Sequence, residues 1–255
     1  MKCGTSEEIA FVDLEYGHVH GSHKRISMPT EIGIAFYNEN TNSIDYSGRR
    51  FVYDINVERW RNVTDQYGNK VGVEASVANL KKNEYNKEID KDFTLNAKQK
   101  KTAYRIAGKA YRDFSFFMNH ILETKEIDKL VFFGDSMEKF AFKRAKINTK
   151  GYEWVDMQTE IKDEYDMDML LSLDKVSEAI KFRNKETRIM SSNFRYNVPD
   201  KYKHLIKPHK ALGDSARIFL AYKEFNHDKN KFKKRMNKHL ELCNDNLNLM
   251  RTKAA

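Results

Sequence analysis

Cysteine and long apolar runs are both scarce in this chain of 255 residues. Its two cysteines, Cys3 and Cys243, are too few for a disulfide framework and do not form a metal-ligand cluster. This favours a reducing compartment, so we expect a cytoplasmic protein. The chain has no stretch near the roughly 18 uninterrupted apolar residues of a membrane span, and its polar residues 1–8 lack a signal-peptide pattern. We therefore expect no membrane partner.

Several common enzyme motifs are missing as well. There is no Walker loop, no dinucleotide-binding fingerprint and no serine-hydrolase elbow. The chain has instead an excess of positive charge, with 46 Lys and Arg against 37 Asp and Glu. Because basic side chains gain by releasing counterions from phosphates, this charge favours a polyanionic partner. On composition alone, ribosomal, membrane-surface and merely basic proteins stay open.

Apolar periodicity indicates the fold class. A hydrophobic content of 40%, with 16 Phe and 13 Tyr, argues against disorder. The pattern predicts strands at 9–15 and 31–37 and part of a third strand at 50–53, in an antiparallel meander, and an amphipathic helix at 98–123. Further elements follow: a strand at 130–133, a helix after Ser136, a strand near 152–155, and helices near 172–183 and 211–226. Strands that feed helices indicate an α/β layer fold.

Two segments depart from this pattern. Residues 54–97 are polar, and we interpret them as an insertion within a domain spanning 1–226. Residues 227–255 are expected to form an extra basic amphipathic helix, whose apolar stripe needs a partner surface. That surface is the domain itself, a second copy of the chain in a homodimer, or another protein. The cations crowding its beginning include Lys231, Lys234 and Arg235.

Carboxylates recur at the ends of the expected elements. The apolar run Ile9–Val12 is followed by Asp13 and Glu15. These two residues share a face in a strand because alternate side chains point the same way. Two like charges placed together there need a cation. A second acidic turn is Phe133-Gly134-Asp135, and a third stretch runs from His209 to Asp214.

In order and separation, these three stretches resemble the DEDDh group of 3′-to-5′ exonucleases, which includes proofreading subunits, RNase T and oligoribonuclease. The resemblance covers roughly residues 8 to 226. It implies an RNase H-like fold, with a mixed β-sheet of antiparallel and parallel strands flanked by helices. It also implies four metal-binding carboxylates, which match Asp13, Glu15, Asp135 and Asp214, and a catalytic histidine, which matches His209.

The chemistry implied by this resemblance uses two divalent cations. Four converging carboxylates would hold two Mg²⁺ or Mn²⁺ ions, since oxygen-only ligands suit these metals rather than zinc. A neutral His209 would act as the general base for water. We therefore expect hydrolysis of single-stranded RNA or DNA from the 3′ end to nucleoside 5′-monophosphates, with RNA and DNA not distinguished by the sequence.

Some assignments stay open. Gly134 is followed by two acids, Asp135 with the usual residue type and Glu138 with the better distance, and we favour Asp135. Asp156 is expected to be a helix cap rather than a ligand. The alternative function is a catalytically impaired nucleic-acid-binding or protein-interaction module.

Substrate contacts are expected at two places. Tyr16, Gly17 and His18 follow the first motif, where relatives approach the terminal nucleotide, and Tyr16 would stack on a base. The basic cluster at Lys231, Lys234 and Arg235 would contact the strand further away. His18, His20 and His23 are also spaced for zinc or copper, but we interpret them as a loop beside the site.

Overall fold

The computed structural model describes residues 8–19, 26–52, 60–64, 70–76, 97–185, 187–207 and 210–253. Its sheet begins with a meander in which β1 (Glu8–Val19) pairs antiparallel with β2 (Ile26–Asn38), and β2 pairs antiparallel with β3 (Ser43–Arg50). On the other edge of β1, β6 (Ile127–Phe132) lies parallel and is followed by the parallel strand β7 (Glu153–Asp156).

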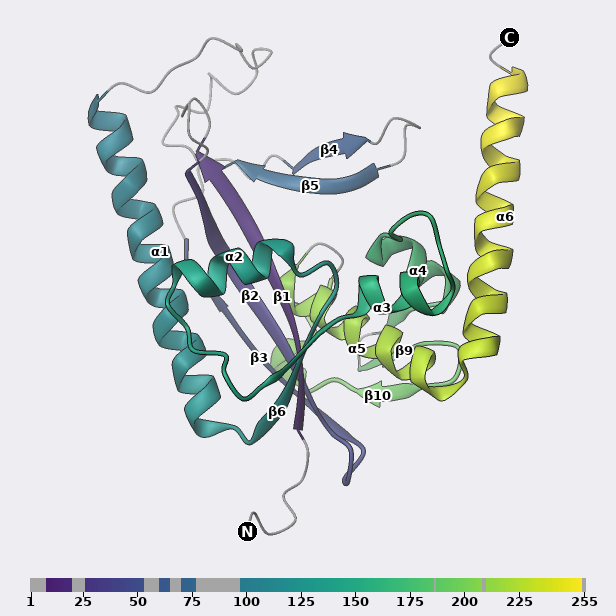
Figure 1. Cartoon of the computed structure of the whole chain (residues 1–255), viewed down its shortest axis with the longest axis horizontal. Helices are drawn as coiled ribbons and strands as arrows, with labels where there is room; N and C mark the ends of the chain where they lie inside the picture. The colour runs from purple at the N-terminus through teal and green to yellow at the C-terminus, as the bar shows by residue number, and fades with distance from the viewer. Residues whose placement is uncertain are drawn as a thin grey trace.

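Helices cover both faces of this sheet (Figure 1). Alternate residues of β1 point to opposite faces of the sheet. Ala10, Val12 and Leu14 pack with α1 (Ala97–Thr124) and α2 (Ser136–Arg144). Ile9 and Phe11 pack on the opposite side with α5 (Ala211–His227). The expected mixed α/β sheet, with antiparallel and parallel strands between helices, is confirmed.

Smaller elements complete the described part of the chain. The helices are α3 (Met157–Glu164), α4 (Leu173–Ala179) and a short 3₁₀ helix (Asp200–Tyr202). The strands β8 (Arg183–Lys185), β9 (Arg188–Met190) and β10 (Arg195–Asn197) form a separate three-stranded sheet. Within the expected insertion, β4 (Trp60–Thr64) pairs with β5 (Lys70–Ser76), and β5 joins the main sheet.

Two expected elements are wrong in their extent. Of the expected strand part at 50–53, only Arg50 is in β3; Phe51 and Val52 follow the strand as buried residues, and Tyr53 lies outside the described residues. The helix expected at 172–183 ends at Ala179, because Lys181 adopts a left-handed φ of 59° and the chain turns into β8.

The C-terminal helix α6 (Lys229–Lys253) packs its first half against the domain itself. Phe232 and Met236 are each 1% exposed within the same core as α5, and Leu240 is partly buried against it. For this half of the apolar stripe, the partner surface is therefore the chain's own core. Among the described helices, none is long and apolar enough to cross a membrane.

Candidate metal centre

A gap in strand pairing lies beside the acidic segment in the middle of β1. Along one edge of this strand, β6 pairs as far as Phe11 and β5 pairs from Gly17 onward. The segment carrying Asp13 and Glu15 lies between these two pairings, while β2 continues along the other edge. A short irregularity in the β1–β2 register follows Glu15. The sheet therefore stays rigid behind these carboxylates but is open beside them.

Gly33 allows α5 to approach these acids. It lies on β2 opposite Asp13 in the strand register. A Cβ atom on Gly33 would lie 2.1 Å from the carbonyl carbon of Ala211 and 2.2 Å from the amide nitrogen of Leu212. Since no side chain fits in this space, glycine is required for the first turn of α5 to rest directly on β2.

A second glycine shapes the other side of the same turn. A Cβ atom on Gly213 would lie 1.9 Å from the carbonyl oxygen of Lys207, so the segment before α5 also packs against backbone. The Asp214 amide then donates to the Lys210 carbonyl at 2.9 Å and starts the helical hydrogen bonds. These contacts fix Asp214 at the end of α5 that faces β1.

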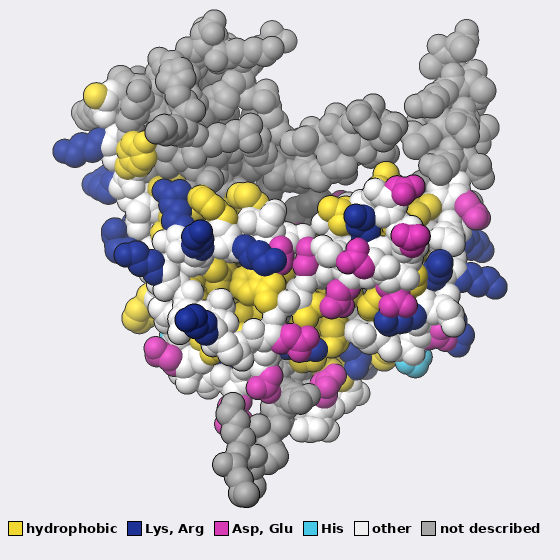
Figure 2. Space-filling view, in the orientation of Figure 1, with side chains coloured by type: hydrophobic (Ala, Val, Ile, Leu, Met, Phe, Trp, Pro, Cys, Tyr) yellow, Lys and Arg dark blue, Asp and Glu magenta, His cyan; other side chains and the backbone are white. Residues whose placement is uncertain are grey.

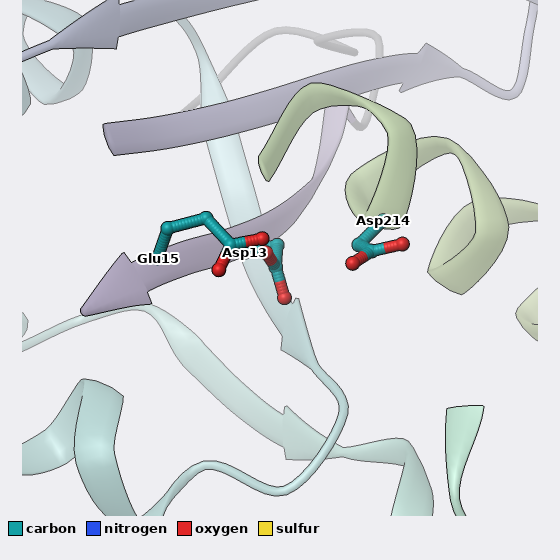
Figure 3. Close-up of side chains that lie close together, drawn as sticks. All are labelled: Asp13, Glu15 and Asp214. Carbon is teal, nitrogen blue, oxygen red and sulfur yellow. The ribbon is translucent and has the colours of Figure 1, made fainter. Parts of the chain in front are cut away.

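Asp13, Glu15 and Asp214 come together in this way (Figure 3). Each offers a carboxylate oxygen, and these oxygens lie within 4.8 Å of one another. Figure 3 shows the two strand carboxylates and the helix carboxylate turned toward one another. The structure thus brings together three of the four predicted metal ligands, from opposite ends of the chain.

The electrostatic environment of Asp13 favours a bound cation. Burial raises the pKa of Asp13 well above its usual range, and the charges of Asp214, Glu15 and Glu138 raise it further, whereas Arg217 lowers it. Without a metal ion, Asp13 reduces the remaining repulsion by keeping its proton. A divalent cation between the carboxylates would offset the same repulsion.

Arg217 is a cationic neighbour that the sequence analysis missed. It is buried on α5 and donates to Asp214 at 2.7 Å, to the Ser177 hydroxyl at 2.8 Å and to Asp174. Burial alone would lower the pKa of Arg217, but the adjacent carboxylates raise it. The sequence signal for this contact was the spacing of three residues between Asp214 and Arg217, since residues three apart are neighbours on a helix. Arg217 therefore orients Asp214 and reduces the local negative charge.

Asp135 faces different partners. It lies before α2, and its Oδ2 accepts from the Trp154 indole N–H at 2.6 Å and lies 2.6 Å from the Lys139 ammonium. These two side chains, with Asp135, line an open acidic pocket of about 280 Å³ that also contains Glu160 and Asp163. Asp135 is not part of the close group formed by Asp13, Glu15 and Asp214.

Glu138, one turn further along α2, is the second acid of this motif. It is 8% exposed, and its Oε2 has no hydrogen-bond partner among the described residues. Burial raises its pKa to about 8, with further contributions from the charges of Asp135, Asp156 and Glu15. A buried carboxylate oxygen without a partner requires an explanation such as a bound ion or water.

Tyr16 lies beside Glu138. Burial raises the pKa of the Tyr16 phenol, and the charges of Glu138 and Asp13 raise it further. Its hydroxyl also lacks a hydrogen-bond partner among the described residues, and its ring packs against the core under α1. Tyr16 is therefore at the site, but its ring is held in the core.

The turn before α2 contains the predicted glycine, and this glycine is hydrogen-bonded to the residue that caps α3. Gly134 adopts a φ of 81°, which favours glycine, and its amide donates to Asp156 Oδ1 at 2.8 Å. Asp156 also accepts from the Gln158 amide at 3.0 Å and from the Thr159 hydroxyl at 2.8 Å at the start of α3. The prediction that Asp156 caps a helix is confirmed.

The other predicted site residues lie partly outside the described residues. Pro208, His209, His20 and His23 are outside them, and of His18 only the backbone is described. Gly17 is buried and pairs with Ala75 of β5. The assignment of His209 as the general base therefore stays a prediction.

The predicted cations of α6 have partners within the chain. Arg235 donates to Glu224 at 2.6 Å, and Glu224 also accepts from Ser191 and Asn193. Lys231 lies 3.1 Å from Asp228, and Lys234 is exposed. Contact of these cations with a substrate stays a prediction.

No protein-family model matches this chain, and no curated protein matches it in sequence. A solved structure described as the crystal structure of full-length 3′-exonuclease resembles it at a TM-score of 0.41 and 13% sequence identity over 89% of this chain. The chain spans 62% of the length of that exonuclease. At this level of similarity, the geometry of the site itself carries the functional interpretation.

Proposed function

We propose that this chain is a metal-dependent nuclease that removes nucleotides from the 3′ end of single-stranded RNA or DNA, in the manner of DEDDh exonucleases. The observation that carries the proposal is the convergence of Asp13, Glu15 and Asp214 within 4.8 Å, next to the unpartnered buried oxygen of Glu138. The excess of positive charge elsewhere on the chain supports a phosphate-containing substrate.

The donor set fits Mg²⁺ or Mn²⁺. All of its donors are carboxylate oxygens, which are the ligands preferred by these cations. When bound, two such ions would stabilise charge on the scissile phosphate and favour ionisation of the attacking water. Asp13, Glu15 and Asp214 would hold them. The fourth carboxylate is Asp135 on residue type, or Glu138 on burial and electrostatics, and we favour Glu138.

The remaining roles belong to residues around this cluster. His209 precedes α5 by two residues and would take the proton of the attacking water. Arg217 would keep the Asp214 carboxylate oriented through its hydrogen bond. Gly17 and the backbone of His18 continue β1 beyond the acids, where the terminal nucleotide would lie.

A non-catalytic module is the second candidate. Two observations favour it: Asp135 is engaged by Trp154 and Lys139, and Asp214 is engaged by Arg217. If these contacts persist with nucleic acid bound, too little negative charge remains for two cations. Such a protein would bind strands without shortening them.

The experiment that tests the proposal incubates the purified chain with 5′-labelled single strands of RNA or DNA, in Mn²⁺, in Mg²⁺ or with a chelator. We expect stepwise shortening from the 3′ end that the chelator abolishes. Asp13→Asn should lower the rate by roughly 100-fold or more, since it removes a metal-binding charge at constant shape. The matched control is Asp128→Asn, an exposed carboxylate on β6. Binding without shortening in both metals would instead favour the module.

A further inference from the structure

Exposed aromatic and apolar side chains gather where α1 meets α2. Tyr104 of α1 is 55% exposed, and Met137 and Phe140 of α2 are 42% and 46% exposed. The Arg144 guanidinium connects the two helices, because it lies 4.6 Å from the ring centre of Tyr111 and 5.9 Å from that of Phe140. Tyr104 is two helical turns before Tyr111, but it is exposed where Tyr111 is buried. A group of exposed apolar side chains on one surface marks an interaction site.

The same surface is strongly basic. Between residues 97 and 112, α1 contains no acidic residue. Among the side chains of the two helices that the structure describes, the exposed cations are Lys101, Arg105, Lys109, Arg112, Lys139, Lys143 and Arg144. The first acid of α1, Asp113, is paired with Lys109, and the single acid of α2, Glu138, is buried. Figure 2 shows Lys and Arg gathered over α1 and α2 with few acidic side chains among them.

This surface adjoins the acidic cluster. Glu138 is buried on the inner side of α2, whose Ala141 and Phe142 pack in the same core cluster as Leu14 of β1. Tyr111 lies on the inner flank of α1, in the core cluster against which Tyr16, the residue after Glu15, packs. The outer sides of the same two helices carry the exposed cations and aromatic rings. Tyr16, which follows Glu15 in β1, thus connects the acidic segment with the two helices that carry this surface.

We propose that the outer surface of α1 and α2, defined by Lys101, Tyr104, Arg105, Arg112, Phe140 and Arg144, holds the part of a single-stranded nucleic acid upstream of the 3′ end in the acidic cluster. The cations contact phosphates, and Tyr104 and Phe140 stack on bases, which are available only when unpaired. This inference rests on the proposed function, whose substrate it places on the protein.

The helix α6 is a poorer surface for the same strand. Of its cations, Arg235 is held by the fully buried Glu224, Lys231 by Asp228, and Lys229 by Glu164. Each would have to leave an acidic partner to contact a phosphate. On the α1–α2 surface, by contrast, Arg144 contacts two aromatic rings, which leaves its charge available.

The test measures affinity for labelled oligonucleotides of two, eight and sixteen nucleotides in Ca²⁺ at several salt concentrations. The variant is the triple substitution Arg105→Gln, Arg112→Gln and Arg144→Gln. Its control, Arg183→Gln with Lys185→Gln and Arg195→Gln, removes the same charge from exposed positions on β8 and β10. A third variant replaces Lys231, Lys234 and Lys238 of α6 with glutamine. A fourth, Tyr104→Ala with Phe140→Ala, removes the stacking rings while leaving every charge in place.

For the two longer strands, we expect the α1–α2 variant to reduce the salt slope by roughly two, since each lost phosphate contact contributes about 0.7 for a single strand. Dinucleotide affinity should change far less. The aromatic variant should lose roughly tenfold or more in affinity for the longer strands. Equal loss in the β8–β10 control, loss only in the α6 variant, or wild-type affinity in the α1–α2 variant would each overturn the inference.

Failure of the proposed function gives a different result. Strand shortening by the wild-type chain is followed separately in Mn²⁺. If no strand is shortened but the α1–α2 variant still loses length-dependent affinity, the surface assignment stands and the exonuclease does not. If the wild-type chain binds no oligonucleotide and the surface instead captures a protein, the inference is overturned.

Discussion

Asp135 and Glu138 lie one helical turn apart but in different surroundings. Asp135 Oδ2 is engaged by an indole N–H and an ammonium group. Glu138 has a buried oxygen without a partner among the described residues and couples electrostatically to Glu15. The contrast at these two residues makes the fourth carboxylate of the site testable.

Asp135→Asn and Glu138→Gln should therefore differ in cleavage of a labelled strand at saturating Mn²⁺. We expect Glu138→Gln to lose roughly 100-fold or more in rate, because a charge next to the cations is removed. Asp135→Asn keeps its shape and one acceptor oxygen, so its loss should be smaller. The reverse order of the two rates would assign the role to Asp135.

The raised pKa of Glu138 also predicts a pH dependence of stability. Its value of about 8, against an ordinary 4.5, means that the folded protein keeps this proton after the unfolded chain has lost it. Stability from this group is thus complete below pH 4.5 and is lost as the pH rises toward 8. In chelator, Glu138→Gln should unfold less readily than wild type at pH 8.5, by roughly 1–4 kcal/mol, and equally at pH 4.5.

Urea unfolding at four pH values measures this difference. The control is Glu123→Gln, an exposed position on α1 that should follow wild type at every pH. A difference between Glu138→Gln and wild type that stays constant with pH would mean that Glu138 is already ionised in the folded protein.

The sequence predicted some residues of the site and could not predict others. Asp13 and Glu15 were predicted to share a face because the geometry of a strand is local. Asp156 was predicted to cap a helix because capping also depends on neighbouring residues. The partners of Asp135 depend on Trp154, which reaches it only through the pairing of β6 with β7. Likewise, the burial of Glu138 depends on the packing of α2 on the sheet. Such tertiary contacts leave no pattern in a single sequence.

At the scale of elements, the contact between α5 and β2 holds the site together. Gly33→Ala should lower the free energy of unfolding by about 1–3 kcal/mol or more, because the new methyl group overlaps the backbone of Ala211. It should also weaken Mn²⁺ binding, since α5 must move away from Asp13. Denaturant unfolding and calorimetric titration with Mn²⁺ measure the two effects.

Gly108→Ala is the matched control for this change. It lies within α1, where a Cβ atom would lie 3.5 Å from the Arg112 guanidinium and no closer to any other atom. Alanine in a helix interior should add about 0.5–1 kcal/mol of stability. If Gly33→Ala matched Gly108→Ala in stability and in Mn²⁺ affinity, the close approach would not position Asp214.

Long amphipathic elements were predicted well, and short ones were not. The helix expected at 98–123 is α1 at Ala97–Thr124, and the helix expected at 211–226 is α5 at Ala211–His227. Their apolar periodicity extends over several turns. The strands β8 to β10 have three residues each, too few for any period to appear. None of these three strands was predicted from the sequence.

At the scale of the whole molecule, α6 closes the core behind α5. Phe232 is 1% exposed, and its ring centre lies 5.5 Å from that of Phe225 and 6.1 Å from that of Tyr165. Phe232→Ala should therefore lower the free energy of unfolding by about 3–5 kcal/mol. The exposed neighbour Lys234→Ala should change it by about 0.5 kcal/mol or less. Equal effects in thermal unfolding would mean that α6 is not part of the core.

The division of the acidic cluster between β1 and α5 also matters during synthesis. A ribosome adding roughly 5–20 residues per second makes Asp13 and Glu15 many seconds before Asp214. Until α5 is made and packs on Gly33, the nascent chain carries only two of the three carboxylates. Any activity that depends on these three carboxylates is therefore absent until α5 has been synthesised and has packed against β2.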